Sequence, residues 1–145
     1  MRIVVVAVGP MKEHAYRSLA DEYYARVRRY CAIDEVEVAD GPGDKLVTAL
    51  DKHAKGASIV ALEARGLELD SKGFAREIER LGNRGKGDIA FVLGGKAGLP
   101  EEIVARATAL WSMSRFTFPH RLARLILVEQ IYRATAILRN EPYAH

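Results

Sequence analysis

Residues 89–133 read IAFVLGGKAGLPEEIVARATALWSMSRFTFPHRLARLILVEQIYR, and this stretch decides the fold. It opens with a continuously apolar run at residues 89–93, typical of a strand that is buried on both faces, and it then breaks at the glycine-rich residues 94–98. Pro100 with two acids behind it predicts a new helix, because proline and acidic residues are favoured in a first helical turn. A second apolar run at residues 110–113 predicts another strand.

Strand and helix patterns alternate along the rest of the chain. Further strands are predicted at residues 3–8, 33–38 and 58–62, and helices at about residues 12–30, 44–55, 71–81 and 120–139. Asp44 is expected to cap one helix and Asp70 or Ser71 another, and residues 63–69 are expected to form a loop. Without repeats or a linker, this alternation predicts a single α/β domain over residues 1–145. Its mostly parallel sheet should have five to six strands flanked by helices.

The chain is mildly basic, with a formal net charge of +3 and a pI of about 9.1. Such a charge allows an anionic partner such as RNA without requiring one. The cations that could form an RNA-facing patch, or equally only a solvated surface, are Arg28, Arg29, Arg84, Lys86, Arg115, Arg121 and Arg124.

Cysteine and histidine usage argues against several kinds of site. The single cysteine, Cys31, excludes an internal disulfide and a cysteine-based zinc site, and the four histidines show no metal-ligand spacing. We therefore expect no bound metal. The first residues lack the features of a signal peptide, and no run approaches the roughly 20 apolar residues that span a bilayer. The sequence predicts a cytoplasmic protein without a membrane partner.

Three familiar signatures of nucleotide-binding or hydrolytic sites are absent. A P-loop needs Gly-Lys-Ser/Thr after an earlier glycine, and here Gly95-Lys96 is followed by Ala97. A dinucleotide-binding turn needs three spaced glycines after an early strand, and only Gly9 follows the first strand. The same lack argues against the common Rossmann-type methyltransferases. No Gly-x-Ser-x-Gly elbow for a hydrolytic serine is present.

Two unusual loops remain, GGKAG and WSMSRFTFPHRL, and each follows a predicted strand. Such loops predict a ligand crevice, since α/β sheets bind ligands outside the carboxyl ends of their strands. The motifs IVVVAVG, VALEARG, FVLGGKAGL, WSMSRFTFPHRLARLILVEQIYRA and NEPY together cover essentially the whole chain. In these motifs the chain resembles the RlmH family, small SPOUT-class methyltransferases that modify a pseudouridine of the large-subunit ribosomal RNA.

The resemblance implies a fold, a reaction and partners. The expected fold has its C-terminal segment threaded into a trefoil knot, in an obligate homodimer without a DNA partner. The expected reaction transfers a methyl group from S-adenosylmethionine to N3 of a pseudouridine in the intersubunit stem-loop of 23S rRNA in the assembled ribosome, leaving S-adenosylhomocysteine. The cofactor contacts that the resemblance implies are Leu62, Gly94, Gly95, Gly98, Met113, Ser114, Arg115, Phe116, Thr117 and Phe118.

The same resemblance and the residue types suggest the catalytic groups. His120 is the best candidate for the base that removes the N3 proton, and it could equally bind phosphate or the base ring, or it could cap the last helix as a structural residue. Arg124 lies one helical turn further and is expected to share its face and grip phosphate. Tyr143 matches a C-terminal tail that approaches substrate in the family. His145 is displaced by one residue from the family's histidine, so its carry-over is doubtful.

This chain departs from the family in its glycine loop as well. The familiar Gly-Gly-Pro-Glu-Gly is GGKAG here, so an acid is missing and Lys96 is gained, although backbone contacts should survive the change. Two alternatives stay open. One is a SPOUT methyltransferase that acts on another RNA, such as a transfer RNA. The other is a non-catalytic ribosome-binding protein that retains the fold.

Overall fold

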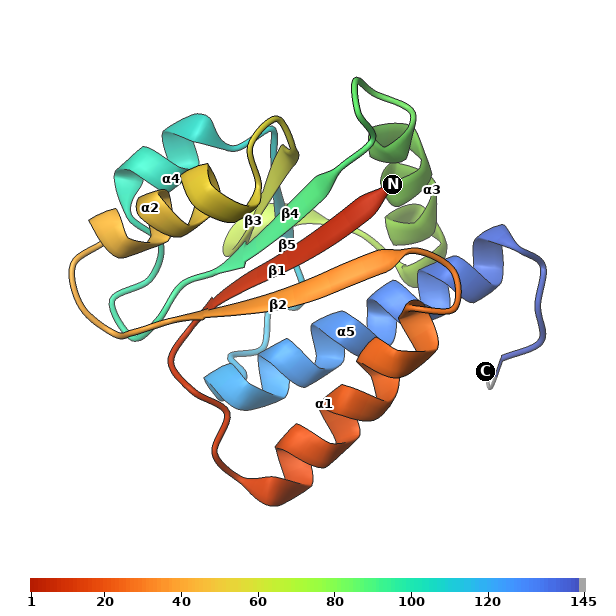
Figure 1. Cartoon of the computed structure of the whole chain (residues 1–145), viewed down its shortest axis with the longest axis horizontal. Helices are drawn as coiled ribbons and strands as arrows, with labels where there is room; N and C mark the ends of the chain where they lie inside the picture. The colour runs from red at the N-terminus through yellow and green to blue at the C-terminus, as the bar shows by residue number, and fades with distance from the viewer. Residues whose placement is uncertain (144–145) are drawn as a thin grey trace.

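Five parallel strands form one sheet in the order β2-β1-β4-β3-β5 (Figure 1). The structure is a computed structural model that describes residues 1–143. The strands are β1 (Arg2–Val8), β2 (Ala32–Val38), β3 (Ser58–Glu68), β4 (Ile89–Leu93) and β5 (Ala109–Ser112). Because all five run the same way, their carboxyl ends lie at one edge of the sheet.

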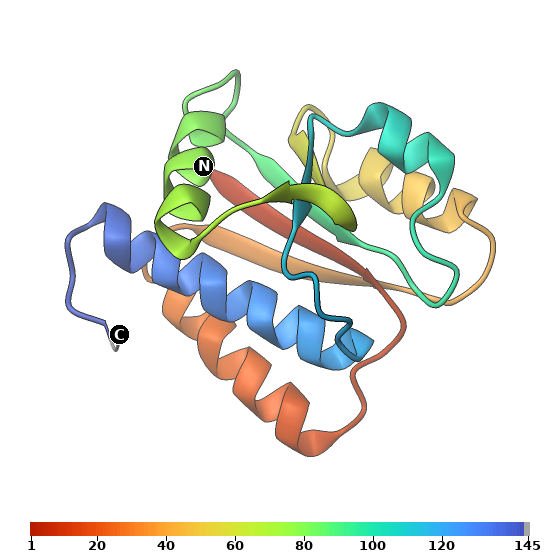
Figure 2. The same cartoon turned by 180° about the vertical axis from the view of Figure 1, so that it is seen from behind.

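Helices cover both faces of the sheet (Figure 1; Figure 2). They are α1 (His14–Val27), α2 (Asp44–His53), α3 (Ser71–Gly82), α4 (Glu101–Arg106) and α5 (His120–Leu138). Helix α5 packs between α1 and α3 on one face, while α2 and α4 lie together on the other. None of these helices combines the length and the apolar character needed to cross a membrane.

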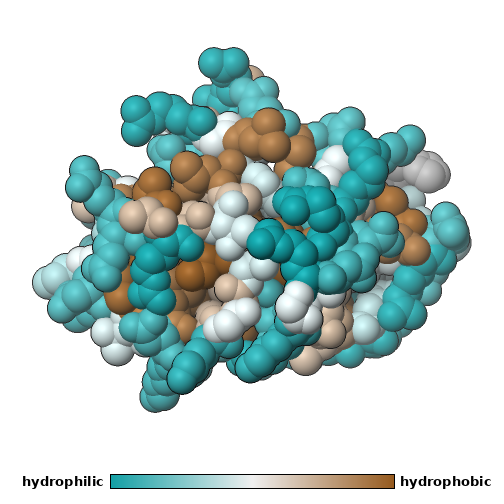
Figure 3. Space-filling model, turned by 90° about the horizontal axis from the view of Figure 1, so that it is seen from above, coloured by the Kyte–Doolittle hydropathy of each residue, from teal (hydrophilic) through white to brown (hydrophobic). Residues whose placement is uncertain are grey.

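Side-chain alternation along the strands builds a separate core on each face. In β1, Ile3 and Val5 join the core under α1, α3 and α5, whereas Val4 and Val6 join the core under α2 and α4. The same alternation in β4 divides its five fully buried residues, so both faces of the central strands are dry. On the face seen in Figure 3, apolar areas are interrupted by polar side chains, as on an ordinary protein surface.

Most predicted elements are confirmed, and two local predictions are wrong. All five strands and the long C-terminal helix lie where the pattern placed them, within a few residues at each end except at the carboxyl end of β3. Asp44 is not an N-cap, since Gly43 takes that position and α2 begins at Asp44. The predicted trefoil knot stays a prediction.

The loop predicted at residues 63–69 is largely strand. Strand β3 pairs with β5 up to Leu62, leaves the ladder, and pairs again when Leu67 lies opposite Trp111. The backbone crosses β5 so closely at Gly66 that a Cβ there would lie 2.7 Å from the carbonyl carbon of Leu110. Glycine is therefore required where this arm passes over its neighbour, and the segment continues the sheet toward α3.

The N-cap of α3 offers a direct test of local stability. The Asp70 side chain accepts a hydrogen bond of 2.7 Å from the Gly73 amide. Asp70→Ala should lower the free energy of unfolding by about 1 kcal/mol, because it removes this cap. Urea unfolding measures the change. Asp44→Ala is the matched control, since Asp44 makes no cap bond; equal losses in the two variants would contradict the capping role.

Candidate cofactor and catalytic site

A cavity of about 520 Å³ opens at the carboxyl ends of β3, β4 and β5. Three connecting segments build it: the residues after Leu62 in β3, the glycine loop after β4, and residues 113–120 after β5. The structure thus gathers residues from three distant parts of the sequence. The predicted site residues that line it are Leu62, Gly94, Gly95, Gly98, Met113, Ser114, Phe116, Thr117, Phe118 and His120.

Backbone packing explains the glycines of the second segment. Gly95 and Gly98 pair in an isolated antiparallel bridge, and the Gly98 amide donates a 2.9 Å hydrogen bond to the Gly95 carbonyl. Gly98 has a φ of +78°, which favours glycine. A Cβ on Gly94 would lie 2.5 Å from the Gly98 carbonyl oxygen. The loop is therefore a closed turn, and its main-chain atoms are exposed to the cavity because its glycines carry no side chains.

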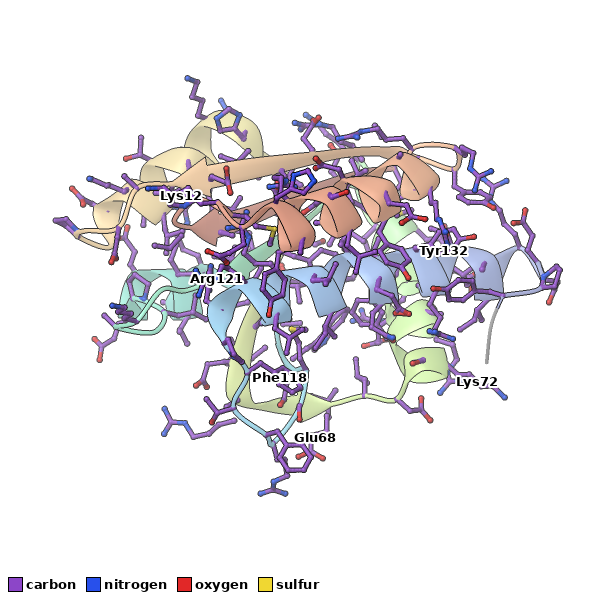
Figure 4. All side chains as sticks on the ribbon, turned by 90° about the horizontal axis from the view of Figure 1, so that it is seen from below. Lys12, Glu68, Lys72, Phe118, Arg121 and Tyr132 are labelled. Atoms are coloured by element: carbon purple, nitrogen blue, oxygen red, sulfur yellow. The ribbon has the colours of Figure 1, made fainter. Side chains whose placement is uncertain are left out.

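The third segment turns sharply after β5. The Ser114 hydroxyl accepts a 2.8 Å hydrogen bond from the Phe116 amide, which fixes this turn. The Phe116 side chain is 83% exposed at the cavity. Arg115, a predicted cofactor contact, is not among the lining residues and points instead toward Glu68, at 3.5 Å. Figure 4 shows this loop, marked by Phe118, beside the end of β3 at Glu68.

His120 begins α5 and lines the cavity. Its Nε2 atom is buried and has no hydrogen-bond partner among residues 1–143. Burial lowers the pKa of this imidazole below 6.5, the charge of Arg124 lowers it further, and a hydrogen bond to the backbone of Val8 acts in the opposite direction. His120 is therefore held mainly in its neutral form at neutral pH.

Arg124 does not lie where a phosphate-gripping residue would be expected. Its side chain is 1% exposed, and its guanidinium binds Glu35, Glu37 and the carbonyl oxygen of Gly9. The prediction of an RNA contact is wrong for this arrangement, because a buried guanidinium with three acceptors cannot meet the phosphate backbone. The helical spacing that places it beside His120 is correct.

The predicted basic patch is divided between two edges of the sheet. Arg28 and Arg29 precede β2, and Arg84 and Lys86 precede β4, so these four cations lie near the amino ends of the strands. The cavity lies at the opposite edge. Close to it, Arg121 is ion-paired with a glutamate at 2.6 Å.

Tyr143 lies at the other end of α5 from His120. Its ring packs edge-on against Tyr132, with ring centroids 4.8 Å apart, and Arg133 lies over it at 4.5 Å. The 19 residues of α5 span about 27 Å, so Tyr143 does not reach the cavity of its own chain. Figure 4 shows α5 running from Arg121 in its first turn toward Tyr132 in its second half. Burial raises the pKa of Tyr143, so its phenol stays protonated at neutral pH and can donate.

One predicted residue, His145, lies outside the described residues. The lining residues that were not predicted include two charged side chains, Glu63 and Lys96. Glu63 follows Leu62 at the point where β3 leaves the ladder, and Lys96 lies exposed at the rim of the glycine loop. Glu63 is only loosely paired, 3.7 Å from Arg65. The rule that ligands lie beyond the strand ends could have found both.

Within residues 1–143 we find no group of three or more His, Cys, Asp or Glu placed to hold a metal.

Comparison with known proteins assigns the family. A family model described as "Predicted SPOUT methyltransferase" matches residues 1–145. The chain belongs to the SPOUT methyltransferase family. This SPOUT chain is 52% identical over 145 residues to a protein of Sorangium cellulosum (strain So ce56) named ribosomal RNA large subunit methyltransferase H, covering all of both chains. A protein of the same name from Anaeromyxobacter dehalogenans (strain 2CP-1 / ATCC BAA-258) is 43% identical over 152 residues, covering 99% of both.

Solved structures show the SPOUT fold at low sequence identity. A probable methylase family protein from Haemophilus influenzae Rd KW20 aligns with a TM-score of 0.60 at 15% identity, covering 99% of this chain and 70% of that one. The tRNA (m1G37) methyltransferase from Aquifex aeolicus gives 0.61 at 11%, covering 100% and 75%. SpoU methyltransferase AviRb from Streptomyces viridochromogenes, solved in complex with AdoMet, gives 0.52 at 13%, covering 92% and 58%. These likenesses support the fold of this SPOUT chain.

Proposed function

We propose that this protein is an S-adenosylmethionine-dependent methyltransferase that modifies N3 of a pseudouridine in 23S ribosomal RNA. The observation that carries the proposal is a cavity at the strand ends, where nine of the ten predicted cofactor residues meet beside His120. Relatives that match along their whole length bear the name of a large-subunit ribosomal RNA methyltransferase. The substrate would be the intersubunit stem-loop in the assembled ribosome, which implies a cytoplasmic location.

The cavity suits S-adenosylmethionine in size and lining. Its 520 Å³ fall within the roughly 300–1,000 Å³ that ligand pockets occupy. Adenine needs an apolar slot with main-chain donors and acceptors, and the segments at Leu62, Gly94 and Met113 offer both. Glu63 and Lys96 supply opposite charges at the same cavity, matching the ammonium and carboxylate groups of a methionine moiety. When bound, the cofactor supplies a methyl group on an activated sulfonium and leaves as S-adenosylhomocysteine.

His120 is the proposed acceptor of the N3 proton. Its neutral imidazole lines the cavity, and its unpartnered Nε2 can complete a hydrogen bond when a substrate arrives. The rest of the rate should come from orientation, which the rigid segments around the cavity provide.

The rim of the cavity offers contacts that suit RNA. Phe116 presents an exposed ring that could stack on an unpaired base, and Lys96 and Arg115 present exposed cations nearby. With a net charge of only +3, the protein should bind free RNA weakly and gain specificity from a preformed ribosomal surface.

A homodimer would complete the site. Leu122, Leu125 and Ile126 are apolar residues on one side of α5 that remain half-exposed in the single chain. A helix face of this kind is usually covered by another element or another chain. Since Tyr143 cannot reach the cavity of its own chain, we propose that it serves the cavity of the partner.

Mixed dimers test this shared site. A chain with Gly94→Val and a chain with Tyr143→Phe should each be inactive as homodimers, whereas their equimolar mixture should recover about a quarter of the wild-type activity if each site uses residues of both chains. The estimate assumes random pairing, in which half of the dimers contain one intact composite site. No recovery in a mixture shown to exchange chains would count against a shared site.

Methyl transfer to ribosomes tests the function itself. Ribosomes that lack the modification, S-adenosylmethionine with a labelled methyl group and the protein are incubated, and the product nucleoside is identified by mass spectrometry. We expect label on N3 of a pseudouridine in 23S rRNA. Label on transfer RNA instead, or cofactor binding without transfer to any RNA, would overturn the proposed substrate or the proposed activity.

A further inference from the structure

We propose that Arg124 is a positioning residue of the methyl-transfer site, which fixes the first turn of α5, and with it His120, against the loop after β1. The inference rests on the proposed function. It assigns to a buried arginine a task that differs from contact with RNA.

The guanidinium joins three parts of the chain. Its Nη1 donates a 2.9 Å hydrogen bond to the carbonyl oxygen of Gly9, directly after β1. Its Nη2 donates to Glu35 at 2.9 Å and to Glu37 at 2.6 Å, both on β2. These bonds attach the start of α5 to the carboxyl ends of two neighbouring strands.

The loop after β1 is also held by the carboxylates that Arg124 binds. Glu37 accepts a 2.9 Å hydrogen bond from the Met11 amide, while Arg124 binds the Gly9 carbonyl two residues earlier. His120 uses the backbone of Val8, the preceding residue. His120 and Arg124 therefore bind the backbone of consecutive residues, Val8 and Gly9. A shift of the guanidinium would move this segment and, with it, the hydrogen-bond partner of the imidazole.

The remaining charges around this cluster favour a fixed geometry. Arg17 from α1 forms ion pairs with Glu35 at 2.8 Å and with Glu37 at 3.7 Å, and the Tyr24 hydroxyl donates to Glu35 at 3.2 Å. A buried guanidinium whose partners are themselves held from several sides has little freedom to rearrange.

The charge of Arg124 also acts on His120 directly. Burial lowers the pKa of the imidazole most, and the charge of Arg124 is the second largest influence in the same direction. The hydrogen bond to Val8 raises this pKa, and Arg121 lowers it by a smaller amount. Glu35 and Glu37 hold the guanidinium through ion pairs of 2.9 and 2.6 Å. Position and protonation of His120 thus depend on the same side chain.

Two kinds of variant separate these effects. Arg124→Met removes the positive charge and all the hydrogen bonds of the guanidinium. Glu37→Gln weakens one of these bonds and leaves the positive charge in place. We measure kcat and KM on ribosomes, cofactor affinity by calorimetry, and the titration of His120 by NMR with His120→Asn for assignment. Both variants should lower kcat, by about 100-fold in Arg124→Met and about 10-fold in Glu37→Gln, with KM and cofactor affinity changed less than about threefold. The pKa of His120 should rise only in Arg124→Met.

Controls keep the test decisive. Arg80→Met removes an exposed arginine on α3 that is paired with Glu77, away from the cavity, and should leave kcat within about twofold. If Arg124→Met does not fold, Arg124→Lys and Glu37→Gln test the proposal, and both should lower kcat below the wild-type value. Folded variants with wild-type kcat would overturn the proposal. If the wild-type protein transfers no methyl group, the proposed function fails, and the His120 titration still reports whether Arg124 acts on it.

Discussion

Replacing Gly94 with valine should reduce the affinity for S-adenosylmethionine by about 100-fold or more and abolish methyl transfer. A Cβ at this position would lie 2.5 Å from the Gly98 carbonyl oxygen and 2.9 Å from the Leu99 amide nitrogen. Both atoms are backbone, so the closed turn after β4 must open to admit any side chain. Because that turn forms one wall of the cavity, its displacement should remove the surface on which the cofactor rests. Calorimetric titration of the purified protein measures the affinity.

The control for this variant lies in the same loop. Ala97→Ser alters an exposed residue that does not line the cavity, and it should leave the affinity within about twofold. Circular dichroism establishes that Gly94→Val still folds, which is expected because the loop lies outside both cores. Wild-type affinity in a folded Gly94→Val protein would remove this cavity as the cofactor site.

Replacing His120 with asparagine should lower kcat by about 10²- to 10⁴-fold and leave cofactor affinity nearly unchanged. Asparagine keeps a polar group of similar reach but cannot accept a proton at neutral pH. Single-turnover transfer to ribosomes measures the chemical step without product release. A binding role for His120 would instead raise KM with little change in kcat, so the two parameters distinguish the alternatives that the sequence left open.

The pH dependence should report the same group. A lowered pKa means that His120 of the free protein stays neutral until the pH falls below 6.5, so kcat/KM should decline on the acid side with a midpoint under 6.5. The same sign makes the folded protein lose stability as the pH falls through that range, because the unfolded chain takes up the proton more readily. In His120→Asn the acid limb should disappear, whereas His53→Asn, at the end of α2, should retain it.

Local patterns in the sequence predicted the repeating parts of this fold well. Strand β4 was found at its observed bounds because five apolar residues between polar connectors leave little choice of structure. The pattern of strands and loops predicted a crevice at the loops near Gly94 and Met113, and the individual cofactor contacts came from a resemblance to a family. The strand order β4-β3-β5 that brings the two loops together could not be predicted from the sequence.

Features that depend on long-range packing could not be predicted in this way. The arm of β3 beyond Leu62 has polar residues and looks like a loop until it meets β5, where Gly66 permits a close crossing. Arg124 looks like a surface cation because arginine usually is one, and only the approach of Glu35 and Glu37 from β2 makes its burial favourable. In both cases the deciding partner lies far away in the sequence.

The all-parallel sheet also has a consequence for how the protein is made. Strand β1 lies between β2 and β4, so one of its edges stays unpaired until residue 93 has been synthesised. Neighbouring parallel strands cannot start as hairpins, and α5 supplies Leu127, Val128 and Ile131 to the larger core only after all five strands have been made. On the ribosome, the face of the sheet that α5 covers must therefore stay open until this helix has emerged.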